Sequence, residues 1–325
     1  MHEGDSLMEQ RTFGRSGLQV SLAGMGCNTL GWWVGEDQGT RVVHAALDSG
    51  VALFDTADMY DDGTSERILG KALAGRRQDV AIVSKFGLKT ESDQRDIPRG
   101  SRDYIIRSCE GSLRRLGTDY IDLYLHHAPD PLTPVTETLD ALDRLIDQGK
   151  IRYYGCSNYR GWQIADAAWQ ADSRCVPRFV AAQNKWNLLA RETETEVVPA
   201  ARRFELGIMP YYPLAMGFLT GKYTADGKPP ESSRLSAGEA DRSSMLSAEN
   251  FERLDRLASY AADHGKSLLE LAIGWLASHD IVTTVICGAT REDQVKANAA
   301  ATGAWKMTAS EVDEIAAIAG QSEGT

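Results

Sequence analysis

Short apolar runs rich in β-branched residues alternate along the chain with longer stretches in which apolar residues recur every three to four positions. The short runs predict strands, and the longer stretches predict helices with one buried face. The predicted strands cover residues 20–25, 52–54, 80–83, 121–125, 151–154, 179–182, 207–210 and 284–286. The predicted helices cover residues 41–47, 66–73, 104–116, 135–146, 162–169, 194–204, 251–262 and 294–301. Gly50, Gly117 and Gly149 follow predicted helices, and glycine is a common helix stop signal.

This alternation also predicts how the elements assemble. Repeated strand and helix units favour parallel βαβ connections, and eight of them in 325 residues match an α/β fold, the closed (β/α)8 TIM barrel. An open, doubly wound sheet is the alternative. Residues 12–20 have the pattern of strand, turn and strand, which predicts a short N-terminal β-hairpin before the barrel. We therefore expect a flexible N-terminus over residues 1–11 and a single barrel domain over residues 12–325, with one long loop at residues 223–247.

The charge balance narrows the range of partners. The chain has 35 Lys and Arg against 46 Asp and Glu, a formal net charge of −11. Such a surface repels phosphate backbones and anionic lipids, so we expect neither nucleic acid nor a membrane as a partner. The five cysteines form no CxxC pair, and residues 1–11 lack the features of a signal peptide, which together predict a cytoplasmic protein. The scattered histidines and cysteines predict no metal site.

Polar side chains gather at the predicted carboxyl ends of the strands, where barrel enzymes carry their chemistry. Asp55 and Tyr60 follow one strand, Lys85 ends the next, and His126 and His127 end the one after that. A nearby ammonium group lowers the pKa of a phenol, and a buried lysine needs a carboxylate as its counter-ion. A neutral imidazole can donate a hydrogen bond to a carbonyl oxygen. Together these groups predict a general acid beside a polarised carbonyl group, rather than a structural ion pair alone.

Several motifs resemble signatures of the aldo-keto reductase superfamily, in particular its bacterial branch similar to potassium-channel beta subunits. Residues 54–60 with residues 65–70 resemble its Asp/Tyr signature, and residues 116–130 resemble its histidine signature. Residues 149–158 resemble its Gly-x-Ser-Asn element, and residues 211–223 resemble its pyrophosphate loop. The resemblance covers nearly the whole chain and implies a barrel that binds NADP(H) without a Rossmann domain.

By this resemblance the catalytic tetrad is Asp55, Tyr60, Lys85 and His127. His126 is the competing histidine, because strand ends predicted from sequence are uncertain by more than one residue. The family's His-x-Pro-Asp context favours His127. The channel-associated branch carries asparagine at this position, so the histidine favours a working enzyme over a purely regulatory subunit.

The resemblance also assigns contacts to the cofactor. Ser157, Asn158 and Gln183 match positions that bind the nicotinamide carboxamide, and Tyr211 matches the aromatic residue that stacks on the nicotinamide ring. The other implied cofactor contacts are Gly26, Cys27, Asn28, Asp55, Tyr212, Pro213, Leu214, Gly217, Lys222, Arg234, Gly288, Thr290, Gln294 and Asn298.

The basic residues near the expected phosphate groups bear on the choice of cofactor. Lys222 and Arg234 match residues that reach the 2′-phosphate and the pyrophosphate, whereas Gln294 stands where many reductases carry arginine. We expect NADPH as the cofactor, with NADH less favoured.

An aromatic wall marks the expected substrate pocket, formed by Trp32, Trp33, Met59 and Phe86. Such a wall suits sugars, aryl aldehydes and terpenoid ketones alike. The predicted function is an NADPH-dependent oxidoreductase that reduces a small-molecule aldehyde or ketone to an alcohol, with hydride from nicotinamide and a proton from Tyr60. The alternatives are a cofactor-binding regulatory subunit with little turnover and a non-redox barrel enzyme that uses Tyr60 and Lys85 as acid and base. The sequence predicts no particular oligomeric state.

Overall fold

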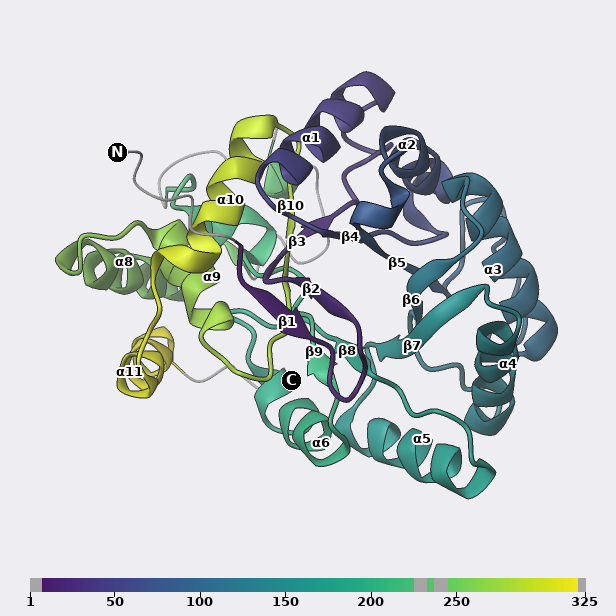
Figure 1. Ribbon diagram of the computed structural model, residues 1–325. Helices are drawn as coiled ribbons and strands as arrows, with labels where there is room; N and C mark the ends of the chain where they lie inside the picture. The colour runs from purple at the N-terminus through teal and green to yellow at the C-terminus, as the bar shows by residue number, and fades with distance from the viewer. Residues whose placement is uncertain (1–7, 225–232, 237–244, 321–325) are drawn as a thin grey trace.

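Eight parallel strands curl into a barrel ringed by helices in the computed structural model, which describes residues 8–224, 233–236 and 245–320 (Figure 1). Their order is β10-β3-β4-β5-β6-β7-β8-β9. The strands are β3 (Ala23–Gly26), β4 (Leu53–Asp55), β5 (Ala81–Phe86), β6 (Ile121–His126), β7 (Ile151–Ser157), β8 (Ala181–Gln183), β9 (Gly207–Ile208) and β10 (Val285–Gly288). Backbone hydrogen bonds of Ile208 with Ile281 and Thr283 close the ring. The predicted (β/α)8 barrel is confirmed, and the open sheet is excluded.

The predicted hairpin is also confirmed, and it lies across the end of the barrel that faces the viewer in Figure 1, which we call the lower end. Its antiparallel strands are β1 (Gln10–Thr12) and β2 (Gln19–Ser21). Phe13 and Val20 are fully buried and pack in the same cluster as the inner barrel residues. β1 begins inside the segment 1–11, and Arg11 is anchored there because its guanidinium donates hydrogen bonds to the carbonyls of Ala277, His279 and Val282. Residues 1–7 lie outside the described part of the chain.

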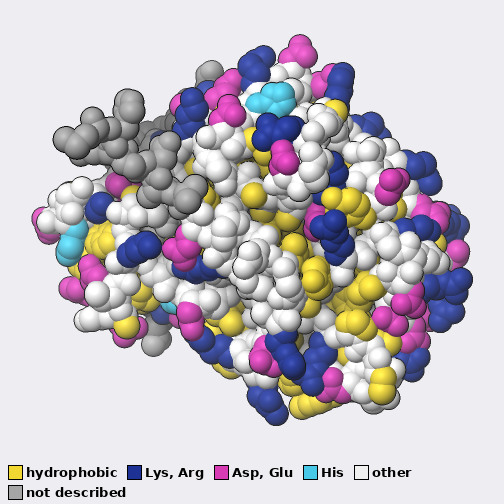
Figure 2. Space-filling view, in the orientation of Figure 1, with side chains coloured by type: hydrophobic (Ala, Val, Ile, Leu, Met, Phe, Trp, Pro, Cys, Tyr) yellow, Lys and Arg dark blue, Asp and Glu magenta, His cyan; other side chains and the backbone are white. Residues whose placement is uncertain are grey.

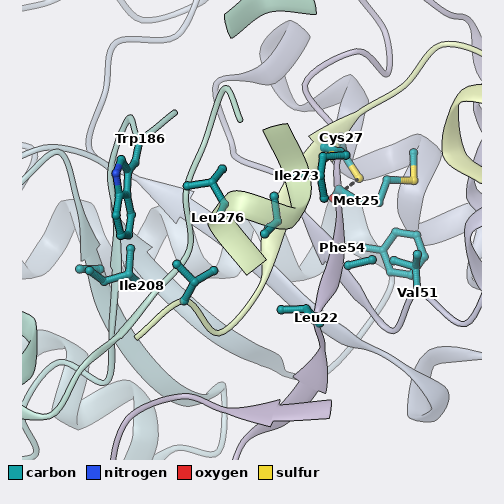
Figure 3. Packing of buried hydrophobic residues seen from close by; sticks show 14 of the residues in the cluster. Leu22, Met25, Cys27, Val51, Phe54, Trp186, Ile208, Ile273 and Leu276 are labelled. Atoms are coloured by element: carbon teal, nitrogen blue, oxygen red, sulfur yellow. Dashed lines mark hydrogen bonds between the residues drawn. The ribbon is translucent and has the colours of Figure 1, made fainter. Parts of the chain in front are cut away.

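Side chains alternate between the two faces of each barrel strand, and this alternation decides which residues reach the site. Leu53, Val83 and Leu123 point inward and form the apolar interior of the barrel. Their neighbours point outward and pack beneath the helices. Figure 3 shows part of this outer layer, with Met25 and Phe54 from the strands near Ile273 from a helix.

Ten α-helices are found in the described residues: α1 (Glu36–Asp48), α2 (Thr64–Ala72), α3 (Arg102–Leu116), α4 (Val135–Asp147), α5 (Gly161–Arg174), α6 (Val197–Phe204), α8 (Ala248–Asp263), α9 (Leu268–Ala277), α10 (Glu292–Ala304) and α11 (Ala309–Ala319). Helix α9 is absent from the prediction because it is apolar on all sides, so it carries no amphipathic period. It packs against α10 and β10, while the predicted helix α8 lies outside it and contacts α11. The C-terminal helix α11 is also absent from the prediction.

The surface is of mixed charge on the face shown in Figure 2, where basic and acidic side chains are interspersed along the helical rim. None of the described helices combines the length and apolar character that crossing a bilayer requires. Most of the predicted loop at residues 223–247 lies outside the described residues.

Candidate active site

A buried lysine lies at the centre of the site. Lys85 Nζ donates hydrogen bonds to Asp55 Oδ2 at 2.8 Å, to the Thr56 carbonyl at 2.8 Å and to Tyr60 Oη at 3.2 Å. Lys85 is fully buried and Asp55 is nearly so, because both point into the barrel from adjacent strands. All three protons of the ammonium group therefore have partners, and the phenol hydroxyl lies directly above it.

The phenol is carried by a turn with unusual backbone angles. Tyr60 begins a 3-10 helix, η1 (Tyr60–Gly63), in which Asp61 and Asp62 have φ of 47° and 50°. Residues other than glycine rarely adopt this left-handed conformation, and it persists where the surroundings hold it. The loop after β3 packs closely here, because a Cβ atom on Gly31 would lie 2.4 Å from Asp61 Oδ2. The tight fit fixes Tyr60 over Lys85.

Burial and charge compete over the protonation of this pair. Burial raises the pKa of Tyr60 above its ordinary value, and the Lys85 ammonium opposes that rise without reversing it. Lys85 therefore acts on the pKa of the phenol in the expected direction, but burial is the larger effect and the net shift is upward. Burial alone would lower the pKa of Lys85, but Asp55 and Tyr60 raise it. Tyr60 is thus protonated and Lys85 charged at neutral pH.

Of the two adjacent histidines, His127 faces the cavity. Leu125 is in register with Lys85 and points inward, and His127 follows it two positions later on the same face. The His127 ring lies edge-on to Tyr60, with 6.0 Å between ring centroids. Burial, with smaller effects from Lys85 and His126, holds the pKa of His127 well below its ordinary value, so the imidazole is neutral.

His126 points to the opposite face of the strand, into the outer layer. Its Nδ1 lies 2.9 Å from the Tyr159 hydroxyl, and its ring stacks on Phe86 with 4.9 Å between centroids. Burial lowers the pKa of His126 to about 4. The geometry therefore favours His127 over His126 as the histidine of the site.

A cavity of about 500 Å³ opens above these groups at the carboxyl ends of the strands. Most of the predicted site residues line it: Gly26, Asn28, Trp32, Trp33, Asp55, Met59, Tyr60, His127, Ser157, Asn158, Gln183, Tyr211, Tyr212, Pro213, Leu214, Gly217, Lys222, Gly288, Thr290, Gln294 and Asn298. Lys85 lies beneath the lining, in contact with Tyr60.

Besides Lys85, three predicted residues are not part of this lining. Phe86 is fully buried in the outer layer, because it follows the inward-pointing Lys85 and so faces outward; its assignment to the substrate pocket is wrong. Cys27 is fully buried, and its Sγ donates to the Met25 carbonyl at 3.7 Å, so its side chain makes no contact with the cavity (Figure 3). Arg234 begins the short helix η5 (Arg234–Ser236), but its side chain lies outside what the structure describes.

We expect Phe86→Ala to destabilise the fold by about 3–5 kcal/mol, because it removes a large fully buried ring from the core. The substitution should leave KM for a carbonyl substrate within a few-fold of that of the unsubstituted protein. Chemical denaturation and steady-state kinetics on the same preparation check both statements. A large rise in KM with unchanged stability would place Phe86 in the substrate pocket after all.

The cavity lining also contains Ala289, which follows the last predicted strand, and residues that the sequence analysis missed: Thr29, Met216, Thr220, Ile286 and Cys287. Thr29 Oγ1 donates to the Ala289 carbonyl at 2.8 Å and so joins the loop after β3 to the end of β10. The general rule that barrel sites use the loops after the strands could have indicated Thr29.

The amide side chains beside the tetrad are held by hydrogen bonds. Gln183 Nε2 donates to Asp55 Oδ1 at 2.8 Å, and Asn158 Nδ2 donates to the His127 carbonyl at 2.9 Å. Asn158 Oδ1 accepts a hydrogen bond from the Tyr211 hydroxyl at 2.8 Å. The floor of the cavity thus offers fixed amide groups next to the tetrad, which is what recognition of another amide requires.

The segment after β9 has the strained backbone that often accompanies a ligand site. Tyr212, Ala215 and Met216 have positive φ, as does Gly217 at 89°. A Cβ atom on Gly217 would lie 2.9 Å from Lys222 Nζ, so glycine leaves the room that the lysine occupies. This curved segment with an adjacent cation fits an anionic group such as a pyrophosphate.

Comparisons with known proteins show what this chain is similar to. The profile described as "Aldo/keto reductase family" matches residues 23–319. A "Probable voltage-gated potassium channel subunit beta" from Oryza sativa subsp. japonica is 36% identical over 96% of each chain. "Aldo-keto reductase YhdN" from Bacillus subtilis is 34% identical over 96% of this chain and 93% of that one. The solved structure "aldo-keto reductase AKR11C1 from Bacillus halodurans (holo form)" is 32% identical, with a TM-score of 0.80 over 96% of each chain.

Proposed function

Because this chain belongs to the aldo/keto reductase family, we propose that it is an NADPH-dependent oxidoreductase that reduces an aldehyde or ketone to an alcohol. The observation that carries the proposal is the contact of Lys85 Nζ with both Asp55 and Tyr60 at the floor of a cavity that His127 also lines. The substrate is a small carbonyl compound, in keeping with the family.

The chain's own groups supply the proton chemistry. Reduced nicotinamide, when bound, supplies the hydride. Tyr60 Oη donates its proton to the oxygen of the substrate as negative charge develops there. Lys85 stabilises the phenolate that remains, and Asp55 balances the charge of Lys85 inside the barrel.

His127 orients the carbonyl group. Its Nδ1 is buried and has no hydrogen-bond partner among the described residues. A buried N–H without an acceptor is costly, so we assign the proton of this neutral ring to Nε2. From there it can donate to the carbonyl oxygen and favour the charge that forms on it.

The same cavity has side chains suited to hold the cofactor. Ser157, Asn158 and Gln183 would bind the carboxamide, and Tyr211 would stack on the nicotinamide ring. Residues 212–217, with Lys222, would surround the pyrophosphate. The amide hydrogen bonds and the positive φ angles described above support these roles.

Cofactor choice follows from local charge. The 2′-phosphate of NADPH adds negative charge in a chain of net charge −11, so it requires nearby cations. A charge-assisted contact contributes about 1.5–3 kcal/mol, or roughly 10- to 150-fold in affinity. We expect NADPH to bind more tightly than NADH, and Arg234→Ala to weaken NADPH binding much more than NADH binding. Titration of both cofactors into both proteins checks this, and a preference of the unsubstituted protein for NADH would show that Gln294 is the better guide.

A second candidate function is that of a cofactor-binding subunit with little turnover, favoured by the similarity to a probable channel subunit. Incubation with NADPH and a panel of aldehydes distinguishes the two. Loss of the absorbance of reduced nicotinamide indicates a reductase. Quenching of tryptophan fluorescence without turnover indicates the subunit, since Trp32 and Trp33 line the cavity. If neither signal appears, the non-redox alternative gains support.

A further inference from the structure

A second cavity, of about 710 Å³, lies outside the barrel. It is bordered by α2, by the loop of residues 87–101 and by α3, and it shares no described lining residue with the catalytic cavity. We call it the arginine groove after five of the residues that line it: Arg67, Arg95, Arg107, Arg114 and Arg115. Asp58 and Asp62, on either side of the catalytic Tyr60, also line it.

The sequence of α3 explains why the arginine groove is recessed along this helix. Arg107, Gly111 and Arg114 are four and three positions apart, so they lie on one face of the helix. Gly111 lies at the centre of that face and contributes no side chain. A Cβ atom there would lie 3.0 Å from Nη1 of Arg115, so the glycine lets this guanidinium lie along the helix.

The groove holds more positive charge than its acidic neighbours balance. Arg95 is paired with Asp93, Arg107 with Asp103 and Arg115 with Glu66.

The other two arginines form no ion pair in the described part of the chain, and Arg114 has only a weaker electrostatic interaction with Glu110, which is itself paired with Lys150. The guanidinium of Arg67 donates only to the Asp62 carbonyl and the Thr64 hydroxyl, and Arg114 is in no ion pair. Both side chains are exposed. In a chain of net charge −11, two arginines that line one cavity and form no ion pair point to an anionic ligand.

Asp58 is a buried polar group of the groove. It is only 6% exposed, and its Oδ1 has no hydrogen-bond partner among the described residues. Burial and the nearby Glu66 raise the pKa of Asp58 to about 8, against the opposing effect of Arg115 and Arg99. The carboxyl group is therefore neutral at pH 7 and does not repel an anion.

We propose that the arginine groove binds a small molecule carrying phosphoryl groups, which Arg67 and Arg114 contact. The planar guanidinium fork matches the oxygens of a phosphoryl group, and forks from separate elements can bind more than one such group. A single carboxylate would leave most of the groove unfilled. The proposal is independent of the reductase function, because the two cavities share no described lining residue.

The test is calorimetric titration of inorganic pyrophosphate into the protein with excess NADP+, which in the proposed function occupies the phosphate contacts of the catalytic cavity, and a loss of affinity in the groove variant locates the bound pyrophosphate whether or not NADP+ binds. We expect saturable binding that Arg67→Gln/Arg114→Gln weakens about tenfold or more. The matched control is Arg256→Gln, which removes an exposed arginine of α8, far along the chain from the groove. Absence of saturable binding, or an equal loss in the control, would overturn the proposal.

Asp58→Asn supplies a second readout. The groups facing Asp58 are Glu66 from α2, Tyr104 and Arg115 from α3, Arg99 from the loop and Tyr124 from β6. As pH rises through about 8, Asp58 becomes an anion and should weaken pyrophosphate binding, whereas asparagine stays neutral.

Pyrophosphate itself gains or loses protons over this pH range, and this changes its binding to both proteins alike. We therefore compare the ratio of the affinities of Asp58→Asn and the unsubstituted protein at each pH. The two proteins should bind equally at about pH 6.5, and the variant should bind more tightly at about pH 9. Equal affinities at both pH values would remove Asp58 from the site.

Discussion

Tyr60→Phe is expected to lower kcat by about 10²- to 10⁴-fold while leaving the affinity for cofactor nearly unchanged. The substitution keeps the ring, whose centroid lies 6.0 Å from the centroids of both Trp32 and His127, so the wall of the cavity is preserved. What it removes is the hydroxyl group in contact with Lys85 Nζ. Steady-state kinetics and cofactor titration measure the two effects separately.

The pH profile sharpens this test. An acid must be protonated to act, so reduction should slow as pH rises through the pKa of Tyr60, which burial raises above its ordinary value. That alkaline limb should be absent from the residual activity of Tyr60→Phe. Tyr153→Phe is the matched control, since its hydroxyl accepts a hydrogen bond from the Gly17 amide of the hairpin, away from the cavity. A kcat for Tyr60→Phe within a few-fold of the unsubstituted value would remove Tyr60 as the acid.

His127→Ala should lower kcat by about 10²- to 10³-fold, because it removes the donor that orients the carbonyl oxygen. His126→Ala should leave kcat within a few-fold of its original value. Instead it should lower the melting temperature, since it deprives the buried Tyr159 hydroxyl of its partner and Phe86 of its stacked neighbour. The unpaired hydroxyl alone costs about 1–3 kcal/mol.

Kinetics and thermal unfolding of both variants check the assignment together. The reverse pattern, with His126→Ala inactive and His127→Ala merely less stable, would mean that His126, and not His127, lies on the inward face of the barrel.

Strand register explains why the pattern of strands alone could not separate His126 from His127, so that the choice of His127 rested on the family resemblance. Apolar runs and the polar residues that follow them place Asp55 and Lys85 at strand ends without any knowledge of pairing. The choice between His126 and His127 depends on which residue of β6 lies opposite Lys85, and that residue is Leu125. No periodic pattern in the sequence specifies this register. Phe86 was misplaced for the same reason, because it is paired with His126 on the outward face.

Features formed by loops and by uniformly apolar helices could not be predicted from the sequence, for a different reason. The arginine groove depends on a loop whose shape is set by contacts across the chain, such as the hydrogen bond at 2.7 Å from the Gly100 amide to Asp130 Oδ2. The sequence around Gly100 and Asp130 has no pattern that indicates that these two residues form a hydrogen bond. Helix α9 lacks a polar face, so hydrophobic periodicity could not distinguish it from a buried strand or a core segment.

The hairpin that covers the lower end of the barrel limits the routes by which Tyr60 could be reprotonated. Phe13 and Val20 close the lower end, and the inner layer above them is apolar, with Leu123 and Met209 among its members. In the proposed mechanism Tyr60 must regain a proton after each turnover, and charged carriers cross a layer of packed hydrocarbon poorly. We therefore expect the replacement proton to enter through the mouth of the cavity, which would also be the exit for an alcohol product. Reprotonation of Tyr60 and release of the product would thus use the same opening, so slow release of the alcohol would also delay the return of the proton.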